Sequence, residues 1–273
     1  MIYFETDYVG EVYNLEHPRV LWNSISRRGT VAVSTEAAGF EGVNAATATT
    51  YDAWKPTALP ATWTLTFDTS EQVNAVAIDT HTCGTSGATV TVQEWTGSAW
   101  ADVVSGTPID DEPMAFLFAS RSTDMIRLSI NTTLPTLRLD FSTETYTTGA
   151  PIPSIAVIHC SYALEIPQPV YMGAATPIDM ALQTEFETVQ SAEGQYLGRS
   201  IMRRKNKNDF NVQHLTETYV RATLMPFIKD ARAYPYFLLE RPYTRPTALS
   251  YRWMDQDIVP DRMGIKNLMQ VSL

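Results

Sequence analysis

The stretch Ala61-Thr62-Trp63-Thr64-Leu65-Thr66-Phe67 decides the fold class of this chain, because apolar residues and threonines alternate along it. A period of two is typical of a β-strand that buries one face and exposes the other, and β-branched threonine favours extended backbone. We therefore expect Trp63 and Phe67 to lie in the core of a sheet.

Similar short runs surround this stretch from about residue 20 to residue 160. They lie at 73–78, 88–93, 100–104, 116–118, 125–130, 137–141 and 155–158, and turn residues such as Thr96-Gly97-Ser98 separate them. We find no helical pattern between the runs. Strands at this spacing predict a β-sandwich or jelly roll.

The strand rhythm breaks after residue 163. Proline and glycine at positions 167, 169, 173 and 177 predict a linker or extended arm over residues 164–178, where residues 170–172 are able to pair with a sheet edge.

The remaining segment has a different order of elements. We expect a strand at 183–190, a turn at 191–194, a hairpin of 196–205 and 209–213 with its tip at Lys205-Asn206-Lys207-Asn208, and strands at 236–239, 250–253 and 267–273. Thr216 is a suitable N-cap for a helix that Pro226 kinks or restarts. The predicted fold class is mainly β, with an N-terminal β-sandwich or jelly roll over 1–163, a linker or arm over 164–178, and a β-rich domain with one helix over 179–273.

Charge is unevenly distributed along the 273 residues, whose net charge is −10. Residues 1–150 hold 7 Lys/Arg and 18 Asp/Glu, a net charge of −11, whereas residues 151–273 hold 13 and 12, a net charge of +1. The acidic first part does not favour nucleic acid as a partner, because phosphate contacts need Lys and Arg. The sequence shows no targeting segment and no apolar stretch of about 18 residues, so we do not expect membrane insertion.

The sequence offers no focused catalytic or metal site. It contains no nucleophile elbow, phosphate-binding loop or dinucleotide fingerprint, and none of its four histidines has a second one two to four residues away. Cys83 and Cys160 are far apart and are interpreted as free thiols. The run Asp110-Asp111-Glu112 is either a solvated turn, the favoured interpretation, or part of a calcium site. We therefore predict no enzyme activity, no cofactor and no metal; an esterase or glycosidase lacks the paired side chains it needs.

Two groups of residues are candidates for binding. Tyr51, Trp54, Trp95 and Trp100 lie near predicted loops or strand ends, where exposed rings stack on sugars or anchor an interface; packing in the core or at its rim is the alternative. Arg203, Arg204, Lys205 and Lys207 form the one basic run, which is a candidate for contact with an acidic partner or simply an exposed turn.

The first part resembles a known family of sandwiches. An aromatic-bearing loop, Tyr51-Asp52-Ala53-Trp54-Lys55-Pro56, precedes the strand with Trp63, Leu65 and Phe67, and Trp95-Thr96-Gly97-Ser98-Ala99-Trp100 follows later. This order resembles discoidin-like (galactose-binding-like) jelly rolls over roughly residues 20–160. The resemblance implies the fold, but it transfers no binding residue, because that family's sugar and lipid contacts sit on variable loops.

The second part resembles a tail-associated module of phage and prophage proteins. The phrases Glu193-Gly194-Gln195-Tyr196-Leu197-Gly198-Arg199-Ser200, Pro235-Tyr236-Phe237-Leu238 and Tyr251-Arg252-Trp253 carry this resemblance, together with a hairpin–helix–strand order similar to the tail-tube fold. One departure is that tube domains begin at the N-terminus, whereas here the jelly roll comes first.

These resemblances imply a function and a set of partners. The main hypothesis is a structural component of a bacteriophage tail, near the distal tail or tail-tip hub, made in the host bacterial cytoplasm and located in the virion. Its partners are then further copies in a ring, as a hexamer or trimer, and the tube, hub and tape-measure proteins. The alternative is a carbohydrate-binding module that attaches to a host-surface glycan, which requires exposed Trp or Tyr on one face.

Overall fold

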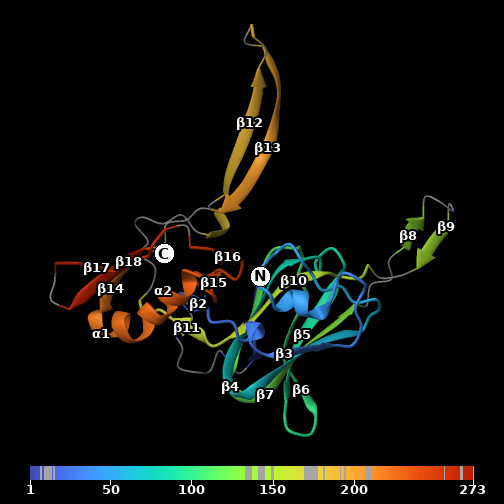
Figure 1. Cartoon of the computed structure of the whole chain (residues 1–273), viewed down its shortest axis with the longest axis horizontal. Helices are drawn as coiled ribbons and strands as arrows, with labels where there is room; N and C mark the ends of the chain where they lie inside the picture. The colour runs from blue at the N-terminus through green and yellow to red at the C-terminus, as the bar shows by residue number, and fades with distance from the viewer. Residues whose placement is uncertain are drawn as a thin grey trace.

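The computed structural model (Figure 1) describes residues 1–6, 8, 14, 16–132, 137–140, 145–148, 151–168, 178–180, 182–190, 192–193, 195–206, 211–254, 256–264 and 267–272. The first part holds β1 (Ile2–Phe4), β2 (Arg19–Leu21), η2 (Ile25–Arg27), β3 (Thr30–Val33), η3 (Gly42–Ala46), β4 (Ala61–His81), β5 (Ala88–Trp95), β6 (Trp100–Gly106), β7 (Met114–Thr132), β8 (Leu137–Asp140), β9 (Thr145–Thr148) and β10 (Ile155–Ser161). The rest holds β11 (Ala163–Glu165), η4 (Ile178–Met180), β12 (Leu182–Gln190), β13 (Tyr196–Asn206), β14 (Asn211–Thr216), α1 (Glu217–Tyr219), the π-helical turn η5 (Val220–Leu224), α2 (Met225–Ala231), β15 (Tyr236–Leu239), β16 (Leu249–Arg252), β17 (Asp261–Arg262) and β18 (Leu268–Ser272).

The sandwich is one seven-stranded sheet whose two longest strands, β4 and β7, serve both of its layers. The first half of β4 and the second half of β7 pair with each other and with β3 and β5, and β6 adds to β5. The second half of β4 and the first half of β7 pair with β10 and β1. Irregular register near Glu71 and Val73 marks the change between the halves. The runs expected as separate strands at 62–67 and 73–78 are therefore one strand.

Side chains from both halves meet in one core, the sandwich core. Trp63 and Leu65 come from the first half of β4, Ile78 comes from the second half, and Phe116 comes from β7; all four are fully buried. Phe67 is also buried there, so the predicted core positions Trp63 and Phe67 are confirmed. The prediction of a mainly β fold with an N-terminal sandwich is confirmed as well.

A second sheet has the order β11-β2-β15-β16, and it joins residues from both ends of the chain. Leu21 of β2 pairs with Ala163 of β11 on one side and with Phe237 of β15 on the other. The division into 1–163, 164–178 and 179–273 stays a prediction, but β2 does not follow it, because this strand completes a sheet made of later segments. β11 also shows that the expected linker begins with a strand, while residues 169–177 lie outside the described residues.

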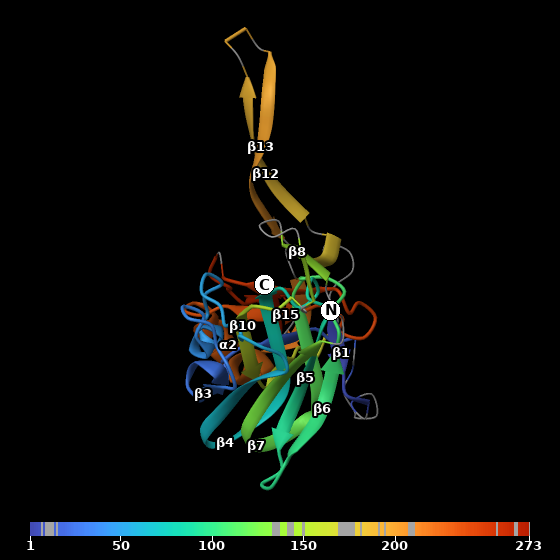
Figure 2. The same ribbon diagram turned by 90° about the vertical axis from the view of Figure 1, so that its right-hand side faces the viewer.

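The two sheets share a second cluster of buried side chains, the junction core. Its members are Ile2, Tyr8, Leu21, Ala75, Ala77, Ala115, Leu117, Ala156, Val157, Ala163, Phe237, Leu239 and Leu249. Apart from Tyr8, they come from the sandwich layer that holds β1 and β10 and from the β11-β2-β15-β16 sheet, which lie against each other (Figures 1 and 2). This shared core fixes one part of the molecule against the other.

A helical segment covers the opposite side of the second sheet. Thr216 accepts a hydrogen bond from the Tyr219 backbone N–H, so the predicted N-cap is confirmed. The segment restarts as α2 with Pro226 in its first turn, as expected for a residue that has no backbone donor. Val220, Phe227 and other apolar side chains of this segment pack on the sheet in a third core.

Two hairpins form separate two-stranded sheets in the described part of the chain. β12 pairs with β13 and projects away from the body in both views (Figures 1 and 2). The smaller β8–β9 hairpin forms a sheet of its own, so the run 137–141 does not extend the sandwich. The expected hairpin of 196–205 with 209–213 is wrong. The strand at 196–206 folds back on 182–190 through nine register pairs, and β14 pairs with β18 instead.

Candidate functional site

The structure separates the four aromatic residues predicted for ligand binding. The Tyr51 side chain is 93% exposed in the loop after η3. Trp54 is completely buried in the sandwich core, where its indole N–H donates to the Thr35 carbonyl at 3.1 Å. The prediction that Trp54 contacts a ligand is therefore wrong, because its ring has no exposed surface.

Trp95 and Trp100 lie side by side at the end of the β5–β6 hairpin. They face each other across the strand pair, with ring centroids 5.3 Å apart and ring planes at 58°. Thr96 and Ala99 close the turn between them through backbone and hydroxyl hydrogen bonds, and Gly97 takes a positive φ of 90° that suits glycine. Both rings are partly exposed, so each offers a face or an edge to solvent.

A chain of polar contacts begins at this pair. The Arg127 guanidinium of β7 lies 4.2 Å from the centre of the Trp100 ring. Arg127 Nε donates to Gln93 Oε1 at 2.7 Å, and Gln93 Nε2 donates to Asp102 Oδ1 at 2.6 Å. Partial burial lowers the pKa of Arg127 from its ordinary value, while the neighbouring Asp102 carboxylate raises it. The side chains thus hold one another in place before any ligand arrives.

The same face continues along β5 and β6 as a row of hydroxyl pairs. The Thr91 and Ser105 hydroxyl oxygens are 2.8 Å apart, and those of Thr89 and Thr107 are 2.7 Å apart. From residue 89 to residue 95 this row is roughly 20 Å long, at about 3.3 Å per residue. We call it the outer face, defined by Thr89, Thr91, Gln93, Trp95, Trp100, Asp102, Ser105, Thr107 and Arg127.

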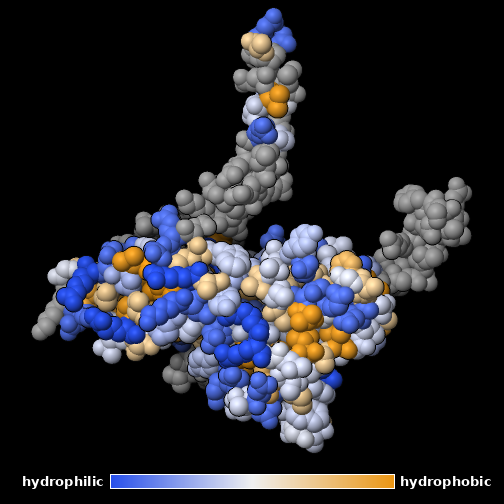
Figure 3. Space-filling view, in the orientation of Figure 1, coloured by the Kyte–Doolittle hydropathy of each residue, from blue (hydrophilic) through white to orange (hydrophobic). Residues whose placement is uncertain are grey.

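This combination of groups suits one kind of ligand. Indole rings offer apolar surface to the C–H face of a sugar ring, and hydroxyl, amide, carboxylate and guanidinium groups hydrogen-bond with its hydroxyls. In Figure 3 the hairpin that projects below the body has intermediate hydropathy rather than forming an apolar patch. Sequence reasoning missed Gln93, Asp102 and Arg127. Their signal was present, since each occupies an outward position in an alternating run.

The basic run lies at the base of the β12–β13 hairpin and not at its tip. Arg203 is paired in register with Glu185, Arg204 with Thr184, and Lys205 with Gln183. Lys207 lies outside the described residues. The expected position of this run at an exposed turn is therefore wrong, because the hairpin closes between Gln190 and Tyr196, which are paired in register. Its role in partner contact stays a prediction.

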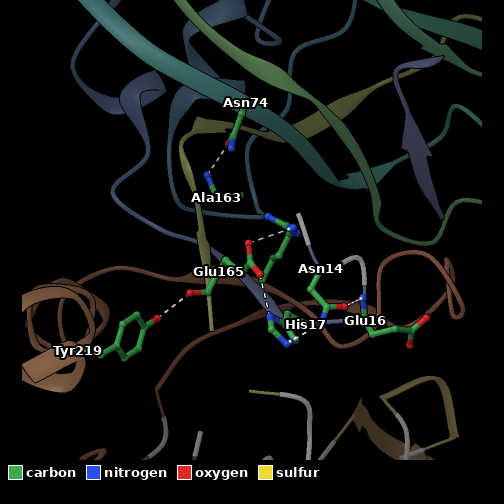
Figure 4. Close-up of polar contacts among 8 residues, drawn as sticks. Asn14, Glu16, His17, Asn74, Ala163, Glu165 and Tyr219 are labelled. Atoms are coloured by element: carbon green, nitrogen blue, oxygen red, sulfur yellow. Dashed lines mark hydrogen bonds and ion pairs between the residues drawn. The ribbon is translucent and has the colours of Figure 1, made fainter. Parts of the chain in front are cut away.

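A polar network near the junction has the form of a catalytic dyad without its nucleophile (Figure 4). His17 Nδ1 lies 2.8 Å from Glu165 Oε1, which would orient an imidazole for acid–base work. The other ring nitrogen, Nε2, lies 2.9 Å from the Asn14 amide nitrogen, where a hydrolase would place Ser or Cys. Tyr219 donates to the Glu165 carbonyl at 2.7 Å, so the network connects the helical segment to β11.

In the described part of the chain, no group of three or more His, Cys, Asp or Glu side chains is placed to hold a metal ion. None of its helices has the length and apolarity needed to cross a bilayer. His159 is buried against Phe237, and burial lowers its pKa to about 3, with the positive charge of Arg27 as a further cause. That the chain is not an enzyme stays a prediction.

Comparisons with known proteins find similarity in structure only. No family model matches this sequence, and no curated protein matches it. The chain is similar to chitosan-binding module 1 of a chitosanase/glucanase from Paenibacillus sp. IK-5, with 19% identity over 50% of this chain and 98% of that chain and a TM-score of 0.39. It is also similar to the family 32 carbohydrate-binding module of NanJ from C. perfringens in complex with galactose, with 14% identity, 53% and 99% coverage and a TM-score of 0.40. A third similar structure is a pectin-binding carbohydrate-binding module, with 13% identity, 51% and 91% coverage and a TM-score of 0.37. This likeness extends over about half of the chain, and it assigns no family, ligand or residue.

Proposed function

We propose that this chain is a non-catalytic carbohydrate-binding protein that binds glycan on the outer face of its sandwich. The observation that carries this proposal is the Trp95–Trp100 pair with Arg127 stacked beside it. Two adjacent indole rings at the end of a polar strand pair provide a stacking surface and a directional hydrogen-bonding surface in one place.

The outer face is also preorganised. Arg127, Gln93 and Asp102 are linked by two short hydrogen bonds, and the sheet beneath them is backed by the fully buried residues Val92 and Leu65. A rigid surface loses little conformational entropy when a ligand binds, which suits the weak individual contacts that a sugar makes.

The test is binding to a panel of soluble polysaccharides of neutral, acidic and amino-sugar types. Retardation in polysaccharide-containing native gels identifies a binder, and titration calorimetry measures its affinity. Trp100→Ala removes one ring and the surface on which Arg127 rests, so we expect at least tenfold weaker binding with only a small loss of thermal stability.

Trp253→Ala is the matched control. Trp253 is 54% exposed in the second part of the chain, next to β16, so this variant loses the same side chain from a different surface. Equal losses in Trp100→Ala and Trp253→Ala, or no binding to any polysaccharide in the panel, would refute the outer face as a glycan site. Tyr51→Ala tests the predicted rim contact separately.

A second candidate function is a structural component of a bacteriophage tail, a ring-forming protein near the distal tail or tail tip and part of the virion. The specific observation in its favour is the β12–β13 hairpin, which projects away from the body (Figures 1 and 2) and, among the described residues, pairs with no further strand. Assembly proteins use such extensions to hold neighbours. The tail role itself rests on the sequence resemblance of residues 165–273. Antibody labelling of purified phage particles, viewed by electron microscopy, tests this role. Phage particles that lack the protein would contradict it.

A further inference from the structure

The β12–β13 hairpin, here called the arm, is a sheet of two strands with both edges open. Among the residues the structure describes, β12 pairs with β13 alone, through nine register pairs from Leu182–Asn206 to Gln190–Tyr196. In Figure 3 its described side chains range from hydrophilic to hydrophobic and stand clear of the body. An open strand edge exposes unpaired backbone donors and acceptors, so it is a template for contact with another chain.

In the described part of the chain, no third strand supports the arm. An isolated two-stranded hairpin is marginally stable in water, because it has no third strand and no core to pack on. Near its far end Val189 is 50% exposed and Tyr196 is 63% exposed. A contact that covered these side chains and one edge would stabilise the arm as well as join the two partners.

Charge indicates what kind of surface the arm fits. β13 contains Arg199, Arg203, Arg204 and Lys205 and no acidic residue. Of these four, Arg203 alone has an acidic residue, Glu185, at its register position. β13 therefore carries four positive charges, and the whole arm, residues 182–206, has a net charge of +1 because Glu185, Glu187 and Glu193 oppose them, whereas residues 1–150 of the same chain carry a net charge of −11.

We propose that the arm of one molecule binds the acidic sandwich of a second copy of this chain. This inference rests on the assembly role given above as the second candidate function and is independent of glycan binding. The length of the arm fits the proposal: the 11 residues of β13 span roughly 36 Å at about 3.3 Å per residue. A globular unit of about 150 residues has a diameter of roughly 38 Å, so one arm reaches across one sandwich. Because arm and sandwich are different surfaces, the contact is head-to-tail and each copy holds the next.

Sedimentation velocity of the full chain tests the proposal. We expect self-association that weakens at least tenfold when salt rises from about 0.05 M to about 0.5 M, because screening weakens contacts between exposed charges. Arg204→Glu with Lys205→Glu should abolish association. Lys229→Glu with Arg232→Glu, the same charge change at exposed positions in and just after α2, should leave it unchanged.

Exchanging the charges of the arm and the sandwich tests whether the sandwich is the surface that the arm binds. Asp110→Lys with Glu112→Lys reverses two exposed carboxylates of the sandwich and spares Asp111, which binds Thr85. This variant should also fail to associate by itself, yet should associate with the Arg204→Glu, Lys205→Glu variant when the two are mixed. A wild-type chain that stays monomeric, or variants whose association is unchanged, would overturn the proposal. Polysaccharide binding by the monomeric variants separates a failure of this inference from a failure of the glycan function.

Discussion

Replacing Phe237 with alanine removes a fully buried aromatic ring from the junction core. Phe237 is completely buried in β15, with its ring centroid 5.5 Å from the imidazole of His159 in β10 and 4.7 Å from the ring of Tyr251 in β16. It therefore contacts both the sandwich and its own sheet. If the junction core couples the two parts, its loss must weaken that coupling and not only the local fold.

The expected magnitude follows from the burial of the ring. Truncating a fully buried phenylalanine costs about 3–5 kcal/mol of unfolding free energy, as lost transfer energy and an unfilled cavity. For a chain of this size each kcal/mol lowers the melting temperature by about 2–4 °C, so we expect a decrease of roughly 6–20 °C.

Calorimetry distinguishes a coupled molecule from two independent parts. We expect the wild-type chain to melt in one main transition, and Phe237→Ala to melt earlier and to separate into two transitions. Phe116→Ala in the sandwich core and Phe227→Ala in the third core, beneath the helical segment, are matched controls, since both rings are also fully buried. Each control should lower the melting temperature without separating the transitions. Two transitions in the wild-type protein, with Phe237→Ala shifting one of them alone, would refute the coupling.

Three further predictions concern buried groups. Because burial lowers the pKa of His159 from 6.5 to about 3, the unfolded chain binds a proton there between these pH values and the folded chain does not. The free energy of unfolding should therefore decrease as the pH decreases, by at most about 1.4 kcal/mol per pH unit. Denaturant titrations at pH 7 and pH 5 measure this decrease, and His159→Asn should lack the part that comes from His159. Trp54→Ala should cost about 3–5 kcal/mol by denaturant titration, because its ring is fully buried; an unchanged midpoint would restore Trp54 as a surface residue. Burial raises the pKa of the Cys83 thiol to about 12 and that of Cys160 further, so both should react with a thiol reagent only as the protein unfolds, and fast labelling of the native chain would contradict this.

The strands of the sandwich could be predicted from sequence because each carries its own signal. Alternation along 62–67 and 125–130 marks one buried face, and the structure places Trp63 and Leu128 in the core accordingly. Strand pairing could not be predicted in the same way, because a period of two shows which face of a strand is buried but not which other strand pairs with it. The place of β2 between β11 and β15 depends on residues more than 140 positions away, and no local pattern encodes it.

The candidate site was predicted in part for the same reason. Trp95 and Trp100 flank the turn Thr96-Gly97-Ser98-Ala99, so a hairpin brings them together, and this was readable locally. Arg127 reaches the pair from β7, a non-local neighbour of β5. Trp54 shows the reverse error: its position in a loop suggested exposure, but a backbone pairing with Ile155 holds it inside.

One signal for the junction core was nevertheless present in the sequence. In the second half of β4, Val76 and Ile78 face the sandwich core, while Ala75 and Ala77 face the junction core. A strand with one solvent-exposed face has polar residues at alternate positions, as the threonines do in residues 62–66. Here alanine takes those positions, and Ala115 and Ala156 do the same in β7 and β10. A strand whose outward positions are small and apolar is buried on both faces, and the missing side-chain volume lets another layer approach closely. The change from threonine to alanine within one strand therefore marks the point where the sandwich stops facing water and begins to face the second sheet.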